Sequence, residues 1–595
     1  MAARGPHFRD PKGTFLPVVL ALTVFVPRFA SGVDRLVTNK TQFTSAMAVV
    51  QPGDVIVWKN GTYNNQSSIL FEPVAQGTSN APITLRPETP GGVIFRGDSQ
   101  LNIGGHYLVV TGFRFDNSNF TFSNSNTVTA IINFRASSTL TRHAYNCRVT
   151  QCAFVSYDNP VTASTSKWFE MYGSTNRFDH NAVSNKVTRG AVLIVELSDT
   201  TNNIACGHRI DHNLFTDRPF GPLSNEYETV RVGTSDYSDQ NARVSVDHNY
   251  FWRCSGEAEV VSSKSCENSY LYNTFVECYG SLTLRHGRGC RVEGNIFFGN
   301  NVADSGGIRV CNRDHVIVNN YLQDLTGSDY QAGLAIMDGS TFTNNTNPDL
   351  SGSYVQVSNV VIAANTLANV AHPVVYGVGK GGSGRTKPPL SLTLAANIIS
   401  GTNAPLFKVT DPPAVPVTYL DNIIWGAASG FATNSELAEA DPLLVADPLG
   451  VLRPATNSPA IGAAGTQSLF SGDLLDMDGA LRPLNGRDIG ADQVGHGARP
   501  PAPQAATEVG PLWMQPTGPP ELIDLTLIPP ETFRISIRSP GTTWAQMLTM
   551  QQSSNPGGPW TNLVGGIAEA DDDGIFDAVV NSNGQPKLFW RVVRP

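Results

Sequence analysis

Charged side chains are scarce in this sequence of 595 residues, at 15% of the total, whereas an average soluble domain has about 25%. Lys and Arg number 41 against 50 Asp and Glu, so the formal net charge is −9. This acidic balance argues against nucleic acid as the main partner. It does not exclude an anionic substrate, because a local cluster of cations can override the total charge.

Long apolar runs are also missing. No segment reaches the roughly 18 apolar residues of a membrane-spanning helix, so no membrane span is predicted. The run Phe15–Val26 is shorter, follows three basic residues and precedes the small residues Ala30–Gly32. This order predicts a signal peptide over residues 1–32 and a secreted protein, extracellular or periplasmic.

The sequence contains no CxxC pair, so a zinc site is not predicted. Its eight cysteines all lie within one stretch of 165 residues. Cys254 and Cys278 are 24 residues apart, and so are Cys266 and Cys290. Equal spacing indicates stacking in a repeat. Disulfides and free buried thiols both stay open, because export would permit disulfides.

What the sequence does contain is a repeat centred on Asn. Each copy reads Asn, any residue, then an apolar residue, and the spacing ranges from 22 to 45 residues with a cluster at 22–25. A period of about 20–50 residues indicates a solenoid. The repeated positions are Asn181, Asn213, Asn249, Asn273, Asn295, Asn320, Asn365, Asn397 and Asn422.

Short runs rich in β-branched residues surround these positions, such as Arg243–Val246 and Val316–Val318, and they are typical of strands. No amphipathic helix recurs with the repeat, which excludes leucine-rich, ankyrin and tetratricopeptide arrays. The pattern therefore predicts an all-β protein, a right-handed parallel β-helix. Its Asn side chains should stack as a ladder of turns rather than carry chemistry.

The remaining segments predict how the chain is divided. Lys40–Val50 is predicted as a helix that would cap the open N-terminal end of the solenoid. The β-helix domain is predicted over residues 33–494. Residues 495–520 are rich in Pro and Ala and are expected to be a linker. Strand-like runs after it predict a small β domain over residues 521–595.

One arc of the predicted coils is too polar for strands that only build a core. Lys264 and Arg285 are 21 residues apart, and Arg285 and Arg309 are 24 apart. Each spacing is about one coil, so the three cations should lie at nearly the same angle of the solenoid. Aligned cations of this kind favour a functional site over scattered surface charges.

Acidic residues accompany these cations. Glu257 and Glu259 are two positions apart, which places them on one face of a strand. Adjacent carboxylates repel unless a cation lies between them. With Asn225 and Glu228 they form a set of oxygen donors, the kind that calcium prefers.

Several segments resemble polysaccharide lyase family 6, which includes alginate lyases and chondroitinase B. The similarity covers roughly residues 34–400, and the segments that carry it are NEYETVRVG, GEAEVVSSKS, LTLRHGRGCRVEGNIFFGN, GGIRV and KWFEMYGSTNRFDHN. The resemblance implies a right-handed parallel β-helix and calcium-assisted β-elimination. Glu226 and Tyr227 depart from it, because they stand where the family commonly has small residues.

The resemblance also implies roles for residues that match its motifs. Lys264 would be the Brønsted base and Arg285 the Brønsted acid. Calcium would be held by Asn225, Glu257 and Glu259, and Glu228 matches the same motif. The substrate cleft would be lined by Arg309, His286 and Tyr172, and Arg231 matches its motif as well.

The leading hypothesis is a secreted lyase that acts on alginate. The nearest alternative is the same chemistry on dermatan sulfate, whose sulfates would need the further cations Lys167, Lys186, Arg189 and Arg288. A glycan-binding β-helix without activity is a third possibility, but binding alone does not need a base such as Lys264. A glycoside hydrolase would need two acids that bracket a bond. The oligomeric state is left open.

Overall fold

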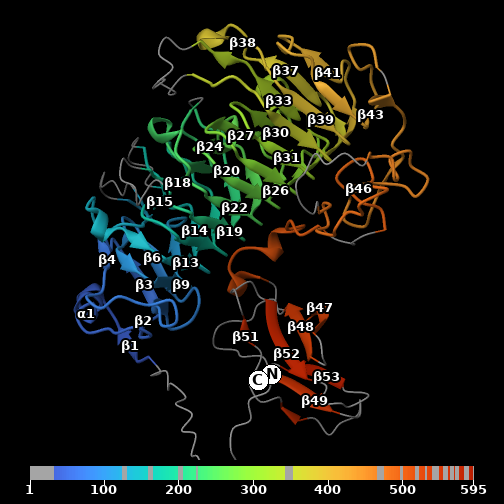
Figure 1. The fold of residues 1–595 in the computed structure, drawn as a ribbon. Helices are drawn as coiled ribbons and strands as arrows, with labels where there is room; N and C mark the ends of the chain where they lie inside the picture. Colours follow the sequence, from blue (N-terminus) through green and yellow to red (C-terminus); the bar gives the residue numbers. More distant parts are fainter. Residues whose placement is uncertain are drawn as a thin grey trace, which may run out of the picture.

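The computed structural model shows a long stack of short strands (Figure 1). It describes residues 32–515, except for gaps at 123–129, 159–164, 198–204, 223–224, 342–352, 434, 466–474 and 496–499, and it describes the strands between residues 521 and 593. The predicted signal peptide, residues 1–32, lies outside the described residues except for Gly32. Among the described helices, none is long and apolar enough to cross a membrane.

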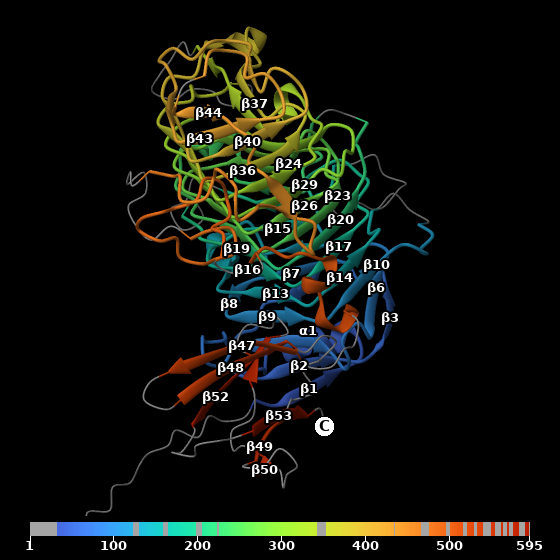
Figure 2. The same cartoon turned by 90° about the vertical axis from the view of Figure 1, so that its right-hand side faces the viewer.

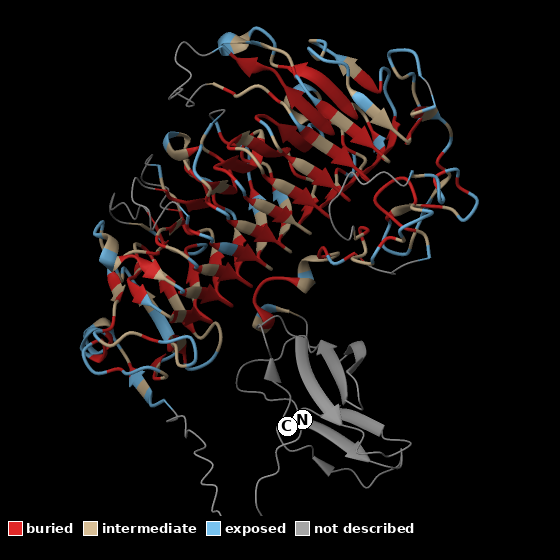
Figure 3. Cartoon of the chain, viewed as in Figure 1, coloured by how far each residue is buried: buried red, intermediate tan, exposed pale blue. Residues whose placement is uncertain are grey.

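Three parallel sheets form the coils, and successive coils add one strand to each sheet. Sheet A runs from β1 (Asp34–Val37) to β42 (Thr418–Leu420), and sheet B from β3 (Gly61–Asn64) to β44 (Leu437–Glu439). The predicted parallel β-helix is confirmed. Figure 2 shows strands of sheet B stacked one beside the next, and the strands enclose a buried interior (Figure 3).

Sheet C carries the polar arc. Its strands, in spatial order, are β4 (Ile69–Phe71), β7 (Leu101–Ile103), β11 (Ile132–Asn133), β15 (Phe169–Met171), β18 (Leu193–Val195), β21 (Val230–Val232), β24 (Glu259–Lys264), β27 (Gly280–His286), β30 (Ser305–Val310), β33 (Leu334–Met337), β37 (Val374–Val378) and β41 (Phe407–Val409).

The helix predicted over Lys40–Val50 is shorter in the structure. Helix α1 spans Lys40–Ala46, and the Asn39 side chain caps it by accepting a hydrogen bond from the Gln42 amide. The following turn brings Val50 into the core, where it is fully buried. Phe43 packs against Trp58 with ring centroids 5.2 Å apart, so the helix packs against the first strands.

The Asn ladder forms as the repeat predicts. Each Asn donates from Nδ2 to the Oδ1 of the next Asn along the stack, over 2.9–3.1 Å, from Asn181 to Asn422. The side chains also donate to backbone carbonyls of neighbouring coils. These bonds satisfy polar groups at the turns between sheets A and B, which are buried and would otherwise be costly.

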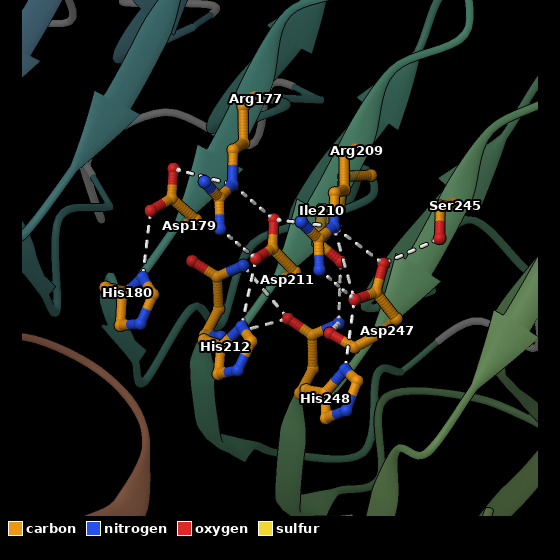
Figure 4. Close-up of polar contacts among 12 residues, drawn as sticks. Arg177, Asp179, His180, Arg209, Ile210, Asp211, His212, Ser245, Asp247 and His248 are labelled. Atoms are coloured by element: carbon orange, nitrogen blue, oxygen red, sulfur yellow. Dashed lines mark hydrogen bonds and ion pairs between the residues drawn. The ribbon is translucent and has the colours of Figure 1, made fainter. Parts of the chain in front are cut away.

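A second ladder lies beside the first, at the ends of β16 (Arg177–Asp179), β19 (Arg209–Asp211) and β22 (Ser245–Asp247) (Figure 4). Each Arg donates to the Asp one coil further along, with bonds of 2.6–3.3 Å. The His after each Asp contacts its carboxylate. The three imidazole rings, His180, His212 and His248, stack at centroid distances of 4.7 and 4.9 Å.

After β44 the chain runs back along the outside of the coils. We call residues 441–515, as far as they are described, the strap. The Gly490 amide donates to Ala396 in a late coil, whereas the Trp513 indole donates to the Gln151 carbonyl in an early coil. The coils therefore end before residue 441, earlier than the predicted boundary at 494.

Residues 500–515 belong to the strap and pack against the coils, although their composition predicts a linker. Ala502, Val509 and Leu512 are buried, and the carbonyl of Pro503 accepts a hydrogen bond from Thr274. Composition misleads here because small apolar residues and Pro suit a segment pressed flat onto a surface as well as a free linker.

The last described strands form two antiparallel sheets in the region predicted as a small β domain. One sheet contains β47 (Glu521–Ile528), β48 (Thr532–Arg538), β52 (Ile575–Asn581) and β51 (Ala568–Glu569), and the other contains β50 (Thr561–Asn562), β49 (Thr549–Ser553) and β53 (Phe589–Val593). The eight cysteines lie in the coils, and all are buried and free.

Candidate active site

Three neighbouring strands of sheet C, β24, β27 and β30, bring the predicted cations together. In the strand register Lys264 pairs with His286, and Thr283 pairs with Arg309. Parallel strands lie about 4.8 Å apart, so residues one coil apart in sequence become neighbours in space. The three cations therefore lie on adjacent strands, as their spacing predicts, but Arg285 is one position from the partner of Lys264 and two positions from the partner of Arg309.

Glu259 is the residue around which the cations gather. Its Oε1 accepts hydrogen bonds from Arg285 Nη1 at 3.2 Å and Arg309 Nη2 at 2.5 Å. Its Oε2 accepts from the Ser262 hydroxyl at 2.5 Å. Burial opposes ionisation, but the charges of Arg285, Arg309 and Lys264 outweigh it and lower the pKa of Glu259 to about 2.

Glu259 also belongs to an acidic cluster. One carboxylate oxygen from each of Glu228, Glu257 and Glu259 lies within 4.8 Å of the others, and all three side chains are buried. Both oxygens of Glu228 and Oε2 of Glu257 accept no hydrogen bond from the described residues. Burial, together with the charges of Glu228 and Glu259, raises the pKa of Glu257 to about 8.

These oxygens fit a bound cation. Buried carboxylates without partners are costly unless a positive charge compensates them. The donors are all oxygen, which suits calcium or magnesium rather than the softer metals that Cys and His select. Among the described residues, Glu228, Glu257 and Glu259 thus form a group that could hold such a cation.

Lys264 lies beside this cluster. Its side chain is only 10% exposed, and its Nζ lies 3.6 Å from Glu228 Oε1. Burial and the positive charges of Arg285 and Arg231 lower the pKa of Lys264, against the opposing effect of Glu228. A lysine with a lowered pKa can act as a base closer to neutral pH.

His286 and two tyrosines extend the site beyond the cations. Burial lowers the pKa of His286 to about 3, so its imidazole is neutral at ordinary pH. Neither of its ring nitrogens has a hydrogen-bond partner in the described structure. The Tyr354 ring lies 5.9 Å from both the His286 ring and the Arg285 guanidinium carbon, and Tyr330 lies 5.4 Å from that of Arg309.

Comparisons with known proteins point to one family. A family model described as Chondroitinase B matches residues 37–403, more than half of the chain, and the solved structures similar to it include alginate lyases of polysaccharide lyase family 6. The chain belongs to polysaccharide lyase family 6. No curated protein matches its sequence.

Two structures of family 6 lyases illustrate the similarity. The alginate lyase AlyGC is 34% identical, with a TM-score of 0.64 over 75% of this chain and 60% of AlyGC. A mannuronic acid specific lyase from human gut microbiota is 30% identical, with a TM-score of 0.61 over 69% of this chain and 91% of that protein. The present chain thus spans well under two thirds of AlyGC.

Of the other predicted site residues, Arg231 lies at the acidic cluster, whereas Tyr172 lies three strands away from it. Arg231, in β21, lies 3.8 Å from Glu228 Oε1. Tyr172 follows β15, three strands from β24, and the Arg135 guanidinium carbon lies 3.8 Å from its ring centre. Asn225 is exposed, three residues before Glu228, and its role as a calcium ligand stays a prediction.

The sequence did not predict the two tyrosines at the site, and it placed Glu257 on the same strand face as Glu259. Tyr330 and Tyr354 lie outside the strands of sheet C, and no spacing rule links them to Arg285 or Arg309. Glu257 precedes β24 instead of lying within it. The two glutamates nevertheless converge, because the chain bends immediately before the strand.

Proposed function

We propose that this family 6 protein is a lyase that cleaves 4-linked uronic-acid polymers, alginate in particular, by calcium-assisted β-elimination. The observation that carries the proposal is Lys264, a buried amine with a lowered pKa, beside an acidic cluster that fits a cation and that also binds the guanidinium of Arg285. A protein that only bound glycans would not need a base of this kind.

The reaction removes the C5 proton of a uronide and expels the oxygen at C4. We assign proton removal to Lys264 Nζ, because its neutral form is favoured by burial and by Arg285 and Arg231. His286 is neutral and has free ring nitrogens within the described site, so it is suited to a hydrogen bond with a sugar hydroxyl or carboxylate.

Arg285 is assigned to the departing oxygen. The resemblance implies that it acts as an acid, but the charge of Glu259 raises the pKa of Arg285 above its already high ordinary value. A guanidinium held so firmly in its charged form gives up a proton reluctantly. We therefore assign it hydrogen bonding to the developing oxyanion, with the proton supplied by water.

Calcium would be held by Glu228, Glu257 and Glu259, with Asn225 as a further candidate. When bound, the ion would neutralise the uronate carboxylate and stabilise negative charge that develops next to it. Arg309 would assist from the same side, since its guanidinium is fixed by Glu259 and by Thr283 Oγ1 at 3.2 Å.

The placement of the other cations supports alginate over dermatan sulfate. Each of the four residues that could recognise sulfate is already engaged within the protein. Lys167 lies 2.5 Å from Glu196, Arg189 lies 2.8 Å from Glu226, and Arg288 contacts Asp239. The amine of Lys186 is buried and donates to the Thr188 carbonyl and hydroxyl.

The test is incubation of the purified protein with polymannuronate, polyguluronate and dermatan sulfate. We expect near-ultraviolet absorbance from a new C4–C5 double bond with the two alginate blocks, and a loss of rate as salt screens the cations. A preference for dermatan sulfate would overturn the substrate assignment. Cleavage without an unsaturated product would overturn the reaction as well.

We also propose that the protein is exported, on the basis of the apolar run Phe15–Val26 and the small residues after it. A secreted lyase would meet a polymer that is too large to enter a cell. Mass spectrometry of the protein from its native host should give a mature N-terminus near residue 33. An intact N-terminus in the cell-associated fraction would contradict export.

A further inference from the structure

Arg218, the last residue of β20 (Leu214–Arg218), is almost fully buried and contacts no acidic side chain closely. Its Nη1 donates to the Lys186 carbonyl at 2.5 Å and its Nη2 to the Gly190 carbonyl at 3.1 Å. Within the part of the chain that the structure describes, it forms no ion pair. Burying an unpaired guanidinium is costly, so its position calls for a physical reason.

One reason is the aromatic ring above it. The guanidinium carbon of Arg218 lies 4.9 Å from the centre of the Tyr227 ring, and Tyr227 is itself only 4% exposed. A cation over an aromatic face is stabilised most where water is excluded. Tyr227 stands directly before Glu228, so Arg218 holds the segment that presents this carboxylate.

The same pair of residues supports the second acidic segment. Arg218 pairs in register with Cys254, and its carbonyl accepts a hydrogen bond from the Ser255 amide at 2.7 Å. At Gly256 an added Cβ would lie 2.2 Å from the Tyr227 carbonyl oxygen and 3.1 Å from Arg218 Cγ. Gly256 therefore packs directly on both residues, one position before Glu257.

Residues 186–190 form the fixed support for this arrangement. The Gly190 amide donates to the Glu226 carbonyl at 2.7 Å, and Arg189 forms an ion pair with the Glu226 side chain at 2.8 Å. Asp158 accepts hydrogen bonds from the Thr188 amide and hydroxyl. Glu226 and Tyr227 depart from the small residues common in the family, and both are held here: Glu226 contacts this support directly, and Tyr227 contacts Arg218, which donates to it.

We infer that Arg218 and Tyr227 are positioning residues for the calcium site, which hold Glu228 and Glu257 at the separation that the ion requires. The inference rests on the proposed function, since it assumes that calcium binds this cluster. The oxygens of the three buried carboxyl groups must lie within 4.8 Å of one another before the ion arrives. A rigid support keeps them together, so less of the binding free energy is lost in ordering them.

The test is calcium titration by isothermal calorimetry, without substrate, of chelator-treated full-length protein. Arg218→Lys keeps the charge but loses the fork that reaches two carbonyls, and Tyr227→Leu removes the ring. We expect each to weaken calcium binding by about tenfold or more, the effect typical of residues that orient metal ligands. Added calcium should then restore kcat. Tyr227→Phe, which keeps the ring, should bind calcium as the wild type does.

A matched control separates positioning from stability. Arg482 is also buried and donates to the carbonyls of Gly490 and Ala491 in the strap. Arg482→Lys should lower the Tm yet leave the calcium Kd unchanged. If Arg218→Lys does not fold, Arg189→Gln provides a milder change, because Arg189 is 41% exposed, and it should weaken calcium binding by less than the roughly tenfold expected for Arg218→Lys.

Each outcome has a distinct meaning. Wild-type protein that binds no calcium would overturn the calcium assignment in the proposed function, and this inference with it. Wild-type binding that Arg218→Lys, Tyr227→Leu and Arg189→Gln all leave unchanged would overturn only the positioning role. If Arg482→Lys lost calcium affinity as strongly as Arg218→Lys does, the loss would reflect general destabilisation of the protein, and the positioning role would be overturned.

Discussion

Lys264 is the residue on which the proposed chemistry depends most. Lys264→Ala should lower kcat by about 10³-fold, within the range that general bases contribute. Lys264→Arg should lower kcat by a similar factor, because a guanidinium stays protonated and cannot accept the C5 proton. The measurement is the rate of unsaturated uronide formation from alginate, with circular dichroism to confirm the fold.

Lys408 provides the control for this prediction. It lies in β41 of the same sheet, but it is 42% exposed and pairs with Asp329 at 2.8 Å. Lys408→Ala should leave kcat nearly unchanged. Wild-type turnover in Lys264→Ala or Lys264→Arg would remove Lys264 from the mechanism.

Glu257 links calcium binding to pH. Burial, Glu228 and Glu259 raise its pKa to about 8 in the protein without metal, so at pH 7 the group is largely protonated. Calcium needs the carboxylate, and binding at pH 7 should therefore release close to one proton, with less release at pH 9. Affinity should rise with pH until the pH passes about 8.

Calorimetry in buffers of different ionisation enthalpy measures this release directly. Glu257→Gln should abolish the released proton and weaken calcium binding, since the amide has no proton to lose and no charge to offer. Proton release that is the same at pH 7 and pH 9, or that persists in Glu257→Gln, would contradict the assignment.

The sequence predicts which coils carry the site residues, but it does not predict the contacts between their side chains. Lys264, Arg285 and Arg309 could be placed on adjacent strands from spacing alone, because one coil separates each from the next, but their offsets within the register could not be predicted. That Glu259 binds both arginines could not be predicted, since a hydrogen bond depends on side-chain direction. Tyr354 could not be found either, because it reaches the site from a segment outside the regular strands.

At the scale of the strands, the Asn ladder should contribute strongly to stability. The buried side chain of Asn273 donates to Val246 and Asn295 and accepts from Asn249, with bonds of 2.8–3.0 Å. Asn273→Ala leaves several of these groups without partners, at about 1–3 kcal/mol each. We expect the free energy of unfolding to fall by roughly 3–5 kcal/mol in urea denaturation.

Asn64 is the matched control, because it is an exposed Asn in strand β3. Asn64→Ala should change the free energy of unfolding by less than about 0.5 kcal/mol. Equal effects of the two substitutions would show that the ladder adds little beyond a surface Asn.

The ladder of Arg, Asp and His was not predicted, although its signal stands in the sequence. Arg177–Asn181 reads RFDHN and Arg209–Asn213 reads RIDHN, so the polar residues repeat together with the Asn. The repeat in the sequence analysis predicts only the Asn ladder, because the pairing of an Arg with an Asp one coil away depends on the register of the strands. When a segment with an Arg and an Asp repeats in every coil of a solenoid, each copy lies beside the copy in the next coil. The Arg of one coil can then form an ion pair with the Asp of the next.

At the scale of the whole molecule, the strap connects the two ends of the solenoid. It leaves the last coil and returns to the first ones, where an added Cβ on Gly91 would lie 2.7 Å from the Trp513 ring. Local composition could not predict this return, because the contacts join residues more than 300 positions apart, such as Gln151 and Trp513. Such contacts depend on the finished surface of the coils.

The strap leads to a prediction for two truncated chains. A chain that ends at Gln515 keeps the described strap and should match the full-length protein in Tm and in activity. A chain that ends at Val494 loses Val509 and Leu512 from their buried positions and loses the hydrogen bonds that Leu512 and Trp513 donate to Gln151. Its Tm should fall by roughly 5 °C, since each lost kcal/mol costs about 2 °C in a large domain.

Activity at 25 °C should survive in both chains, because the residues from Glu228 to Arg309 lie wholly within the coils. Differential scanning calorimetry gives the Tm, and double-bond absorbance with soluble alginate gives the rate. An unchanged Tm in the chain that ends at Val494 would mean that residues 500–515 rest on the coils without stabilising them. Loss of activity in a folded chain that ends at Gln515 would instead mean that the last strands complete the cleft.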